Sequence, residues 1–221
     1  MQQAANSNTG MTKQAICNII FYITLFVLEV FLVGFFGLIK YPDSSYGTVD
    51  SNQSMDFQSH VLLFQQMLMD INIYMLVGYS FLIAYLRFHR WSSLGFSFFS
   101  CAITVQIYIL FSAFWNRSWK GNWGTNYQIT ILEVIGAQKA AVAILISLGA
   151  LMGKVDLFQI LILCFVEMLF YTLNEGILFY AILIRDIGGS FYIHIFASFF
   201  GSAASWIYSP KANSLENPNT Q

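Results

Sequence analysis

Six apolar stretches, each near the roughly 20 residues that cross a bilayer as a helix, constrain this fold more than any other feature. They cover residues 15–39, 71–88, 94–115, 128–152, 157–184 and 189–208. The linkers between them are short except for residues 40–57, whose Pro42-Asp43 pair and Gly47 favour an ordered loop outside the membrane. We therefore predict an all-α fold, a polytopic membrane helix bundle with about six transmembrane helices.

The composition agrees with a membrane protein and excludes several other classes. Charged residues make up only 10% of the chain, against about 25% in an average soluble domain. A net charge of −1 leaves no basic surface for nucleic acid. The three cysteines all lie in apolar stretches without metal-ligand spacing. No nucleophile–base pair or phosphate-binding loop stands out, so we expect neither an enzyme nor a cofactor or metal site.

The polar ends of the chain set the expected domain organisation. Residues 1–14 are expected to form a cytoplasmic tail, residues 15–208 the transmembrane region, and residues 209–221 a cytoplasmic tail or a truncated connecting loop. Asn52-Gln-Ser and Asn116-Arg-Ser are candidate glycosylation sites. Both fall outside the cell if the N-terminus is cytoplasmic, and this orientation places the C-terminus in the cytoplasm as well.

His194 lies in the middle of the last apolar stretch, eight residues after Asp186, and no charged residue follows before Lys211. In a helix it shares one face with small and polar residues, and a titratable group so deep in an apolar span is a functional candidate. That face carries Ser190, His194, Ala197, Ser198, Gly201 and Ser205. A histidine that donates one hydrogen bond across a helix interface remains the alternative.

Other charged residues within the spans also have a functional and a structural interpretation, and small residues there indicate helix packing. Lys139 and Glu175 lie about two turns or more from the nearest span end, so a functional role is harder to dismiss for them than for Glu29 and Glu133. Those two glutamates fit interfacial snorkelling or a subunit contact equally well. Two small-residue patterns are predicted to let helices approach closely. They are Gly149-xxx-Gly153 and the series Ala197, Gly201 and Ser205.

Five motifs, in order and register, resemble the Rh branch of the ammonium transporter family. They are Asp70-Ile-Asn-Ile-Tyr, Trp91-Ser-Ser-Leu-Gly, Ser147-Leu-Gly-Ala-Leu-Met-Gly-Lys154, Asn174-Glu175, and Asp186-Ile-Gly-Gly-Ser-Phe-Tyr-Ile-His194. The resemblance covers the chain from the second span onward, and the first span resembles the additional N-terminal helix of Rh proteins. It implies the first half of an inverted-repeat fold, assembled as a homotrimer or as a hetero-oligomer of Rh-type chains.

The resemblance also implies roles for individual residues. His194 matches the first of two pore histidines, and Asp186 and Glu175 match positions that support the vestibule and the start of the helix. No residue here is expected to match the second pore histidine, because we expect His60 and His89 in loops. Lys139 occupies the position of an outer gating phenylalanine, and Asn72 replaces a histidine that is usual in the family. A permanent cation at the mouth would repel ammonium.

The sequence thus predicts transport of ammonia or ammonium through a histidine-lined apolar pore in the plasma membrane, with this chain supplying the first half. The alternatives are a non-conducting Rh-like structural or assembly subunit, or a truncated product. If the chain is half of a channel, the face with Ser190, His194 and Ser198 should form a polar groove rather than a closed pore.

Overall fold

The computed structural model describes residues 2–37, 54–85, 90–121, 129–184 and 186–209. Side chains are described within these ranges except at residues 2–14, 17, 36, 37, 54–63 and 90. The chain forms two compact units, Met1–Lys40 and Tyr41–Gln221. The first unit contains the single long helix α1 (Gln2–Gly37), which begins within the polar stretch expected to form a tail.

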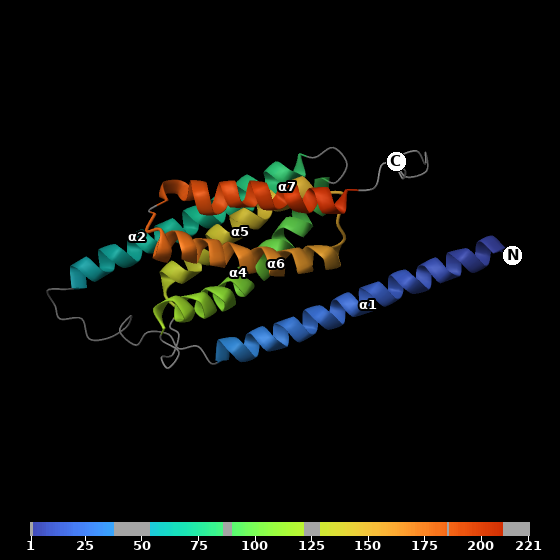
Figure 1. The fold of residues 1–221 in the computed structure, drawn as a ribbon, viewed down its shortest axis with the longest axis horizontal. Coiled ribbons are helices and arrows are strands. Elements are labelled where there is room, and N and C mark those ends of the chain that lie inside the picture. The colour runs from blue at the N-terminus through green and yellow to red at the C-terminus, as the bar shows by residue number, and fades with distance from the viewer. Residues whose placement is uncertain (1, 38–53, 86–89, 122–128, 185, 210–221) are drawn as a thin grey trace. The chain divides into compact units, whose positions relative to one another are not determined.

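The second unit is a bundle of helices (Figure 1), and no strand occurs among the described residues. In chain order it contains α2 (Ser54–Ile73), η2 (Tyr74–Tyr79), α3 (Ser80–Ala84), α4 (Arg90–Lys120), α5 (Ile131–Leu151), α6 (Leu157–Gly176), η3 (Ile177–Ala181), η4 (Ile187–Gly189), η5 (Ser190–Ile195) and α7 (Phe196–Tyr208). The segments η2, η3 and η5 are wide π-helical turns, and η4 is a 3₁₀ turn.

Among the residues that the structure describes, six helical segments are long and apolar enough to cross a membrane, which confirms the predicted fold class. They are Asn18–Phe35, Phe64–Ala84, Trp91–Lys120, Ile131–Leu151, Leu157–Ala181 and Ile187–Tyr208. Most agree closely with the predicted spans. Residues 38–53, which include most of the predicted loop and Asn52, lie outside the described part of the chain.

The second span differs from the prediction at its start. We expected it to begin at residue 71, whereas α2 begins at Ser54 and the apolar segment at Phe64. Gln65, Gln66 and Asp70 interrupt the apolar pattern, but the glutamines are good helix formers and do not end a helix. The expectation that His60 lies in a loop was therefore wrong, since it belongs to α2.

Helix α5 is the most buried span. Of the Ile131–Leu151 segment, 67% is buried, against 17% of Phe64–Ala84. It packs against α4, α7 and α2, and α6 packs mainly on α4. Small side chains make this central place possible, because Ala137, Ala140, Ala141 and Ala143 are all fully buried.

Helices α5 and α7 approach each other closely. A Cβ added at Gly201 would lie 2.8 Å from the Cα of Ser147, so the two backbones meet at a distance that only glycine permits. The Ser147 Oγ is 2.6 Å from Glu167 Oε1 on α6 and 3.0 Å from the carbonyl oxygen of Ala197 on α7. Ala197 and Gly201 thus pack as the small-residue pattern predicted.

Two other packing predictions were wrong. Gly149 is exposed, and no atom of the described residues lies within 4 Å of an added Cβ, so this glycine makes no close helix contact there. The expected single face of the last span also divides, because Ala197 and Gly201 are buried whereas Ser190 and Ser198 are exposed. The π turn η5 shifts Ser190 relative to α7, because it breaks the 3.6-residue repeat on which the expectation was based. Ala197 and Ser198 are adjacent within α7, so their side chains point about 100° apart, and only that of Ala197 is buried.

Hydrogen bonds of Lys154 and Asp156 hold the connection between α5 and the last two spans. The backbone N–H of Asp156 donates to Gln159 Oε1 at 2.9 Å, which completes a capping box at the start of α6. The ammonium of Lys154, just after α5, donates to Ser205 Oγ at 2.6 Å. This contact ties the end of α5 to α7.

Gly201→Ala should destabilise the bundle by about 1–3 kcal/mol, because the new methyl group overlaps the backbone of α5, which cannot move aside easily. Thermal unfolding of the purified protein in detergent measures this. Gly149→Ala is the matched control and should leave the melting temperature unchanged or raise it slightly, since the added methyl group meets open space. Equal effects at both positions would contradict the contact.

Candidate functional site

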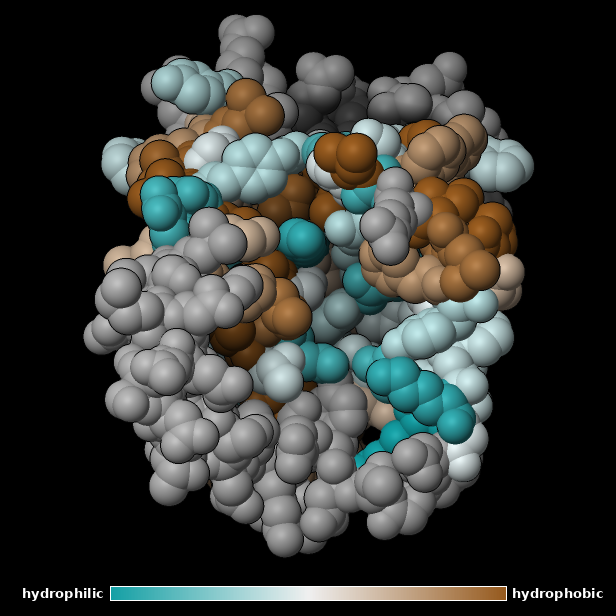
Figure 2. Space-filling model, turned by 90° about the vertical axis from the view of Figure 1, so that its left-hand side faces the viewer, coloured by the Kyte–Doolittle hydropathy of each residue, from teal (hydrophilic) through white to brown (hydrophobic). Residues whose placement is uncertain are grey.

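Two cavities lie at the end of the bundle where α4 ends and the last span begins. Figure 2 looks onto this end, where hydrophilic side chains gather around a hollow. The first cavity has a volume of about 330 Å³ and lies between α4, α5 and α6. Its charged lining residues are Lys120, Glu133, Lys139 and Glu175. The aromatic lining residues are Tyr108, Trp115, Trp119, Phe179, Tyr180 and Tyr192.

Glu175 is held in the first cavity by a tyrosine from α4. The hydroxyl of Tyr108, itself buried, donates to Glu175 Oε2 at 2.9 Å. Gly136 on α5 makes room for this contact, since a Cβ there would lie 2.8 Å from the Tyr108 hydroxyl. The carboxylate therefore has a fixed position in the cavity wall.

Aromatic side chains close the other side of the first cavity. The rings of Trp119 and Tyr180 stack with their centroids 6.3 Å apart. Gly176 permits this arrangement, because its Cβ would lie 2.5 Å from Trp119 Nε1. The Lys120 ammonium lies 5.9 Å from the Tyr180 ring centroid, within the range of a cation–π contact.

Asn116, the second candidate glycosylation site, lies in the last part of α4 and lines the first cavity. Its Nδ2 donates to Ser112 Oγ at 3.2 Å, and its Oδ1 accepts from the Tyr180 hydroxyl at 2.6 Å. A glycan on Nδ2 would compete with these contacts. Glycosylation at Asn116 stays a prediction that runs against the local geometry.

The second cavity brings together three residues that the sequence singled out. It has a volume of about 220 Å³ and is lined by Lys139, Asp186 and His194, among others. The remaining lining residues are Ile71, Tyr74, Val142, Gly188, Gly189, Tyr192 and Ile193. Lys139 also lines the first cavity, so its side chain belongs to the wall between the two.

Asp186 folds back onto the start of the last span. Its Oδ2 accepts from the backbone N–H of Phe191 at 2.6 Å and of Tyr192 at 3.1 Å. Gly188 and Gly189 allow the turn between them, with φ values of 81° and 74° that residues with a Cβ rarely adopt. A carboxylate at the start of a helix is also favoured by the helix dipole.

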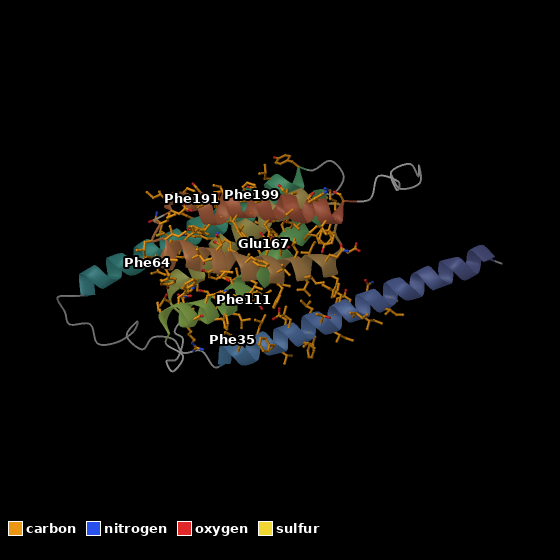
Figure 3. The ribbon with its side chains drawn as sticks, viewed as in Figure 1. Phe35, Phe64, Phe111, Glu167, Phe191 and Phe199 are labelled. Carbon is orange, nitrogen blue, oxygen red and sulfur yellow. The ribbon has the colours of Figure 1, made fainter. Side chains whose placement is uncertain are left out.

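His194 lies in the π turn η5, half-buried, with Tyr192 and Ile193 buried beside it. Its backbone carbonyl accepts from the Ser198 hydroxyl one turn later. Phe191 and Phe199, on the same span, point away from the bundle (Figure 3) and are exposed. The imidazole therefore faces the second cavity, next to the exposed Ser190 and Ser198.

Two contacts of the site were missed at the sequence level. The Tyr108–Glu175 bond gave no signal, because a tyrosine in an apolar helix is ordinary and its partner lies on another helix. Gln138 Nε2 donates to Asn72 Oδ1 at 2.8 Å and joins α5 to α2 directly beside Lys139. Two polar amides in apolar spans are a signal that they pair, although the sequence does not say with which partner.

The arrangement suits a small polar or cationic molecule rather than covalent chemistry. The two cavities offer carboxylate and hydroxyl oxygens and an imidazole, which accept hydrogen bonds. They also offer aromatic faces, which attract a cation. No cluster of metal-ligating side chains occurs among the residues that the structure describes.

The fold and these cavities define a multi-pass helical membrane protein with a polar site at one end of its bundle. A profile of the Ammonium Transporter Family matches residues 7–221, and the chain belongs to this family. The family is one of transporters, not enzymes.

Three similar proteins illustrate the relation. The chain is 29% identical over 88% of its length to Rhesus-like glycoprotein B from Dictyostelium discoideum. It is 30% identical over 82% of its length to Ammonium transporter Rh type C from Bos taurus, and 29% identical over 90% of its length to Ammonium transporter Rh type B from Takifugu rubripes. The matches cover 35%, 40% and 43% of these relatives, so the chain spans less than half of each.

Gly136→Ala should weaken the Tyr108–Glu175 bond and cost about 1–3 kcal/mol in unfolding free energy, because the methyl group displaces a hydroxyl that donates to a carboxylate. A double-mutant cycle with Tyr108→Phe, followed by thermal unfolding, measures the coupling. The glycine substitution should cost clearly less once the hydroxyl is gone. Gly95→Ala on α4, where an added Cβ meets no atom, is the control. Additive effects of Gly136→Ala and Tyr108→Phe would show that the contact is absent.

Proposed function

We propose that this chain forms the first half of a conduction path for ammonia or ammonium across a membrane. The observation that carries the proposal is the second cavity, which is lined by Lys139, Asp186 and His194. Lys139 also lines the first cavity, which contains Glu175. Membership in the Ammonium Transporter Family and the names of the Rh-type relatives supply the substrate class.

Each site residue has a chemical role in this path. The carboxylates of Glu175 and Asp186 make the entrance favourable for a cation, and the aromatic rings of the first cavity add cation–π attraction. A charged ammonium ion cannot cross an apolar interior without a large desolvation cost, so it must lose its proton or be coordinated. A neutral imidazole at His194 both donates and accepts, so it stabilises ammonia without adding a permanent charge.

The exposure of Ser190 and Ser198 beside a half-buried His194 supports a half-site. In this proposal a second repeat covers that polar groove and completes the pore. The whole protein assembles as a homotrimer or with other Rh-type chains in the plasma membrane, and both termini of this chain are cytoplasmic. Glycosylation is proposed at Asn52, which lies outside the described residues, and less favourably at Asn116.

A second candidate function, a non-conducting Rh-like structural or assembly subunit, rests on Lys139. A permanent cation in the wall between the two cavities repels an ammonium ion that passes from one cavity to the other. Within the described part of the chain, the Lys139 side chain forms no hydrogen bond or ion pair that fixes its position, although Glu175 lines the same cavity.

Substitution of Lys139 separates the two functions. Lys139→Met, in the whole protein expressed in cells without their own ammonium uptake, should raise methylammonium uptake up to about a hundredfold. The reason is that one unit charge about 6 Å from another costs roughly 3 kcal/mol at an effective dielectric near 20. Lys139→Phe should act in the same direction, and the charge-preserving control Lys139→Arg should leave uptake low. Equal uptake by the Met and Arg variants would mean that the charge lies away from the path.

Substitution of His194 tests the path itself. His194→Ala, introduced together with Lys139→Met, should abolish the uptake that the latter gains, because nothing then replaces the imidazole as a partner for ammonia. Trp206→Ala, on an exposed side chain of the same span, is the control and should change uptake little. Unchanged uptake without His194 would refute a path past this residue. An assembly role is favoured if every variant reaches the membrane and none transports.

A further inference from the structure

Glu167 is a carboxyl group that the proposed path does not use. It lies near the middle of α6, inside the bundle (Figure 3), and its exposed fraction is zero. One carboxyl oxygen, Oε1, is 2.6 Å from Ser147 Oγ on α5. The other, Oε2, is buried and has no hydrogen-bond partner among the described groups. Burial of an ionised carboxylate with so little compensation would be very costly.

The number of available hydrogen atoms decides the state of this group. Ser147 Oγ lies 2.6 Å from Glu167 Oε1 and also 3.0 Å from the carbonyl oxygen of Ala197. A serine hydroxyl carries one hydrogen, whereas a backbone carbonyl and an ionised carboxylate only accept. If Glu167 were ionised, the single hydrogen of Ser147 could serve only one of its two contacts. In the other contact, two oxygen atoms would face each other without a hydrogen between them. A protonated Glu167 supplies the missing hydrogen.

The described side chains around Glu167 offer no cation to hold a charge on it. On α6 itself, Cys164 and Tyr171 lie about one turn to either side, both buried, and Cys101 of α4 lies near Cys164. The described basic side chains of α4, Arg117 and Lys120, belong to its last turn, at the end of the bundle. The other basic groups on the elements packed against α6 are Lys139 of α5 and His194 of η5. Both line the second cavity, and within the described residues neither forms a hydrogen bond or an ion pair with Glu167.

We propose that Glu167 is a proton-binding site, held as a neutral carboxylic acid that links three helices through Ser147. The carboxylic acid donates its hydrogen to Ser147 Oγ, and Ser147 donates its own hydrogen to the Ala197 carbonyl oxygen. This chain of two hydrogen bonds runs from α6 across α5 to α7 and lies beside the close contact of Gly201 with Ser147.

Glu167 thereby acts as a positioning residue for the last span. Ala197 is three residues after His194, so the hydrogen-bonded chain fixes the part of the span next to the imidazole. The importance of that position for conduction rests on the proposed function, whereas the protonation of Glu167 does not. A measurement that involves no transport therefore tests the proton-binding site alone.

Infrared difference spectroscopy of the protein in lipid vesicles at neutral pH tests the proton directly. The wild-type protein should show the carbonyl stretch of a buried carboxylic acid, and Glu167→Gln should lose it. Glu133→Gln, which removes a carboxyl group at the end of the bundle, is the control and should retain the Glu167 band. Loss of a carboxylate band in Glu167→Gln, in place of the carboxylic acid band, would overturn the proposal.

Two further variants test the chain of hydrogen bonds, and the first of them, Ser147→Ala, keeps the test decisive even if Glu167→Gln does not fold. Ser147→Ala removes the acceptor of the carboxylic acid hydrogen, so the same band should persist and shift to higher frequency. Glu167→Gln should keep a melting temperature near that of the wild type, because its amide donates to Ser147 in the same way, whereas Glu167→Met should lower it. An unshifted band in Ser147→Ala, or equal destabilisation by Gln and Met, would contradict the chain of hydrogen bonds.

Discussion

The contact of Ser147 with Gly201 is the constraint on which the arrangement of the last span depends. Hydrophobic burial does not favour helix association between apolar surfaces within lipid, so close packing and hydrogen bonds must supply it. At Gly201 the missing side chain lets α7 reach the backbone of α5. The Ser147 hydroxyl then comes within hydrogen-bond distance of both the Ala197 carbonyl and Glu167. Close packing and polar contacts therefore depend on the same two residues.

The polar groups of the bundle are separated along its length. Glu133, Glu175, Lys139 and Asp186 line cavities at one end, where charges are less costly because the site is hollow and polar. Glu167 lies in the interior, and within the described ranges Ser147 is its only hydrogen-bond partner. A carboxyl group can therefore attract a cation at the end of the bundle and support helix packing in its interior.

Much of the fold followed from hydropathy, since apolar length alone predicted six spans and nearly all of their bounds. The start of α2 could not be predicted this way, because glutamines within a helix look like the edge of a span. Small-residue patterns were reliable only in part. Gly201 meets a partner and Gly149 does not, and that difference lies in the opposing helix rather than in the pattern itself.

The candidate site was predictable as single residues but not as an arrangement. His194, Asp186 and Lys139 were singled out from charge in apolar surroundings, and the structure places them around one cavity. The partnership of Tyr108 with Glu175 joins residues 67 positions apart. Spacing within one helix carries no information on such a pair. The position of Lys139 between two cavities likewise depends on packing of three spans.

The π turn that carries His194 divides the last span into two parts with separate registers. Such a turn holds one residue more than an α-helical turn, so its loss would rotate the preceding residues by about 100° relative to α7. Asp186 and the two glycines would then leave the second cavity, while Ala197 and Gly201 would keep their packing on α5. In sequence evolution, one insertion or deletion within Ser190–Ile195 could therefore rebuild the lining of the cavity without disturbing the interior of the bundle.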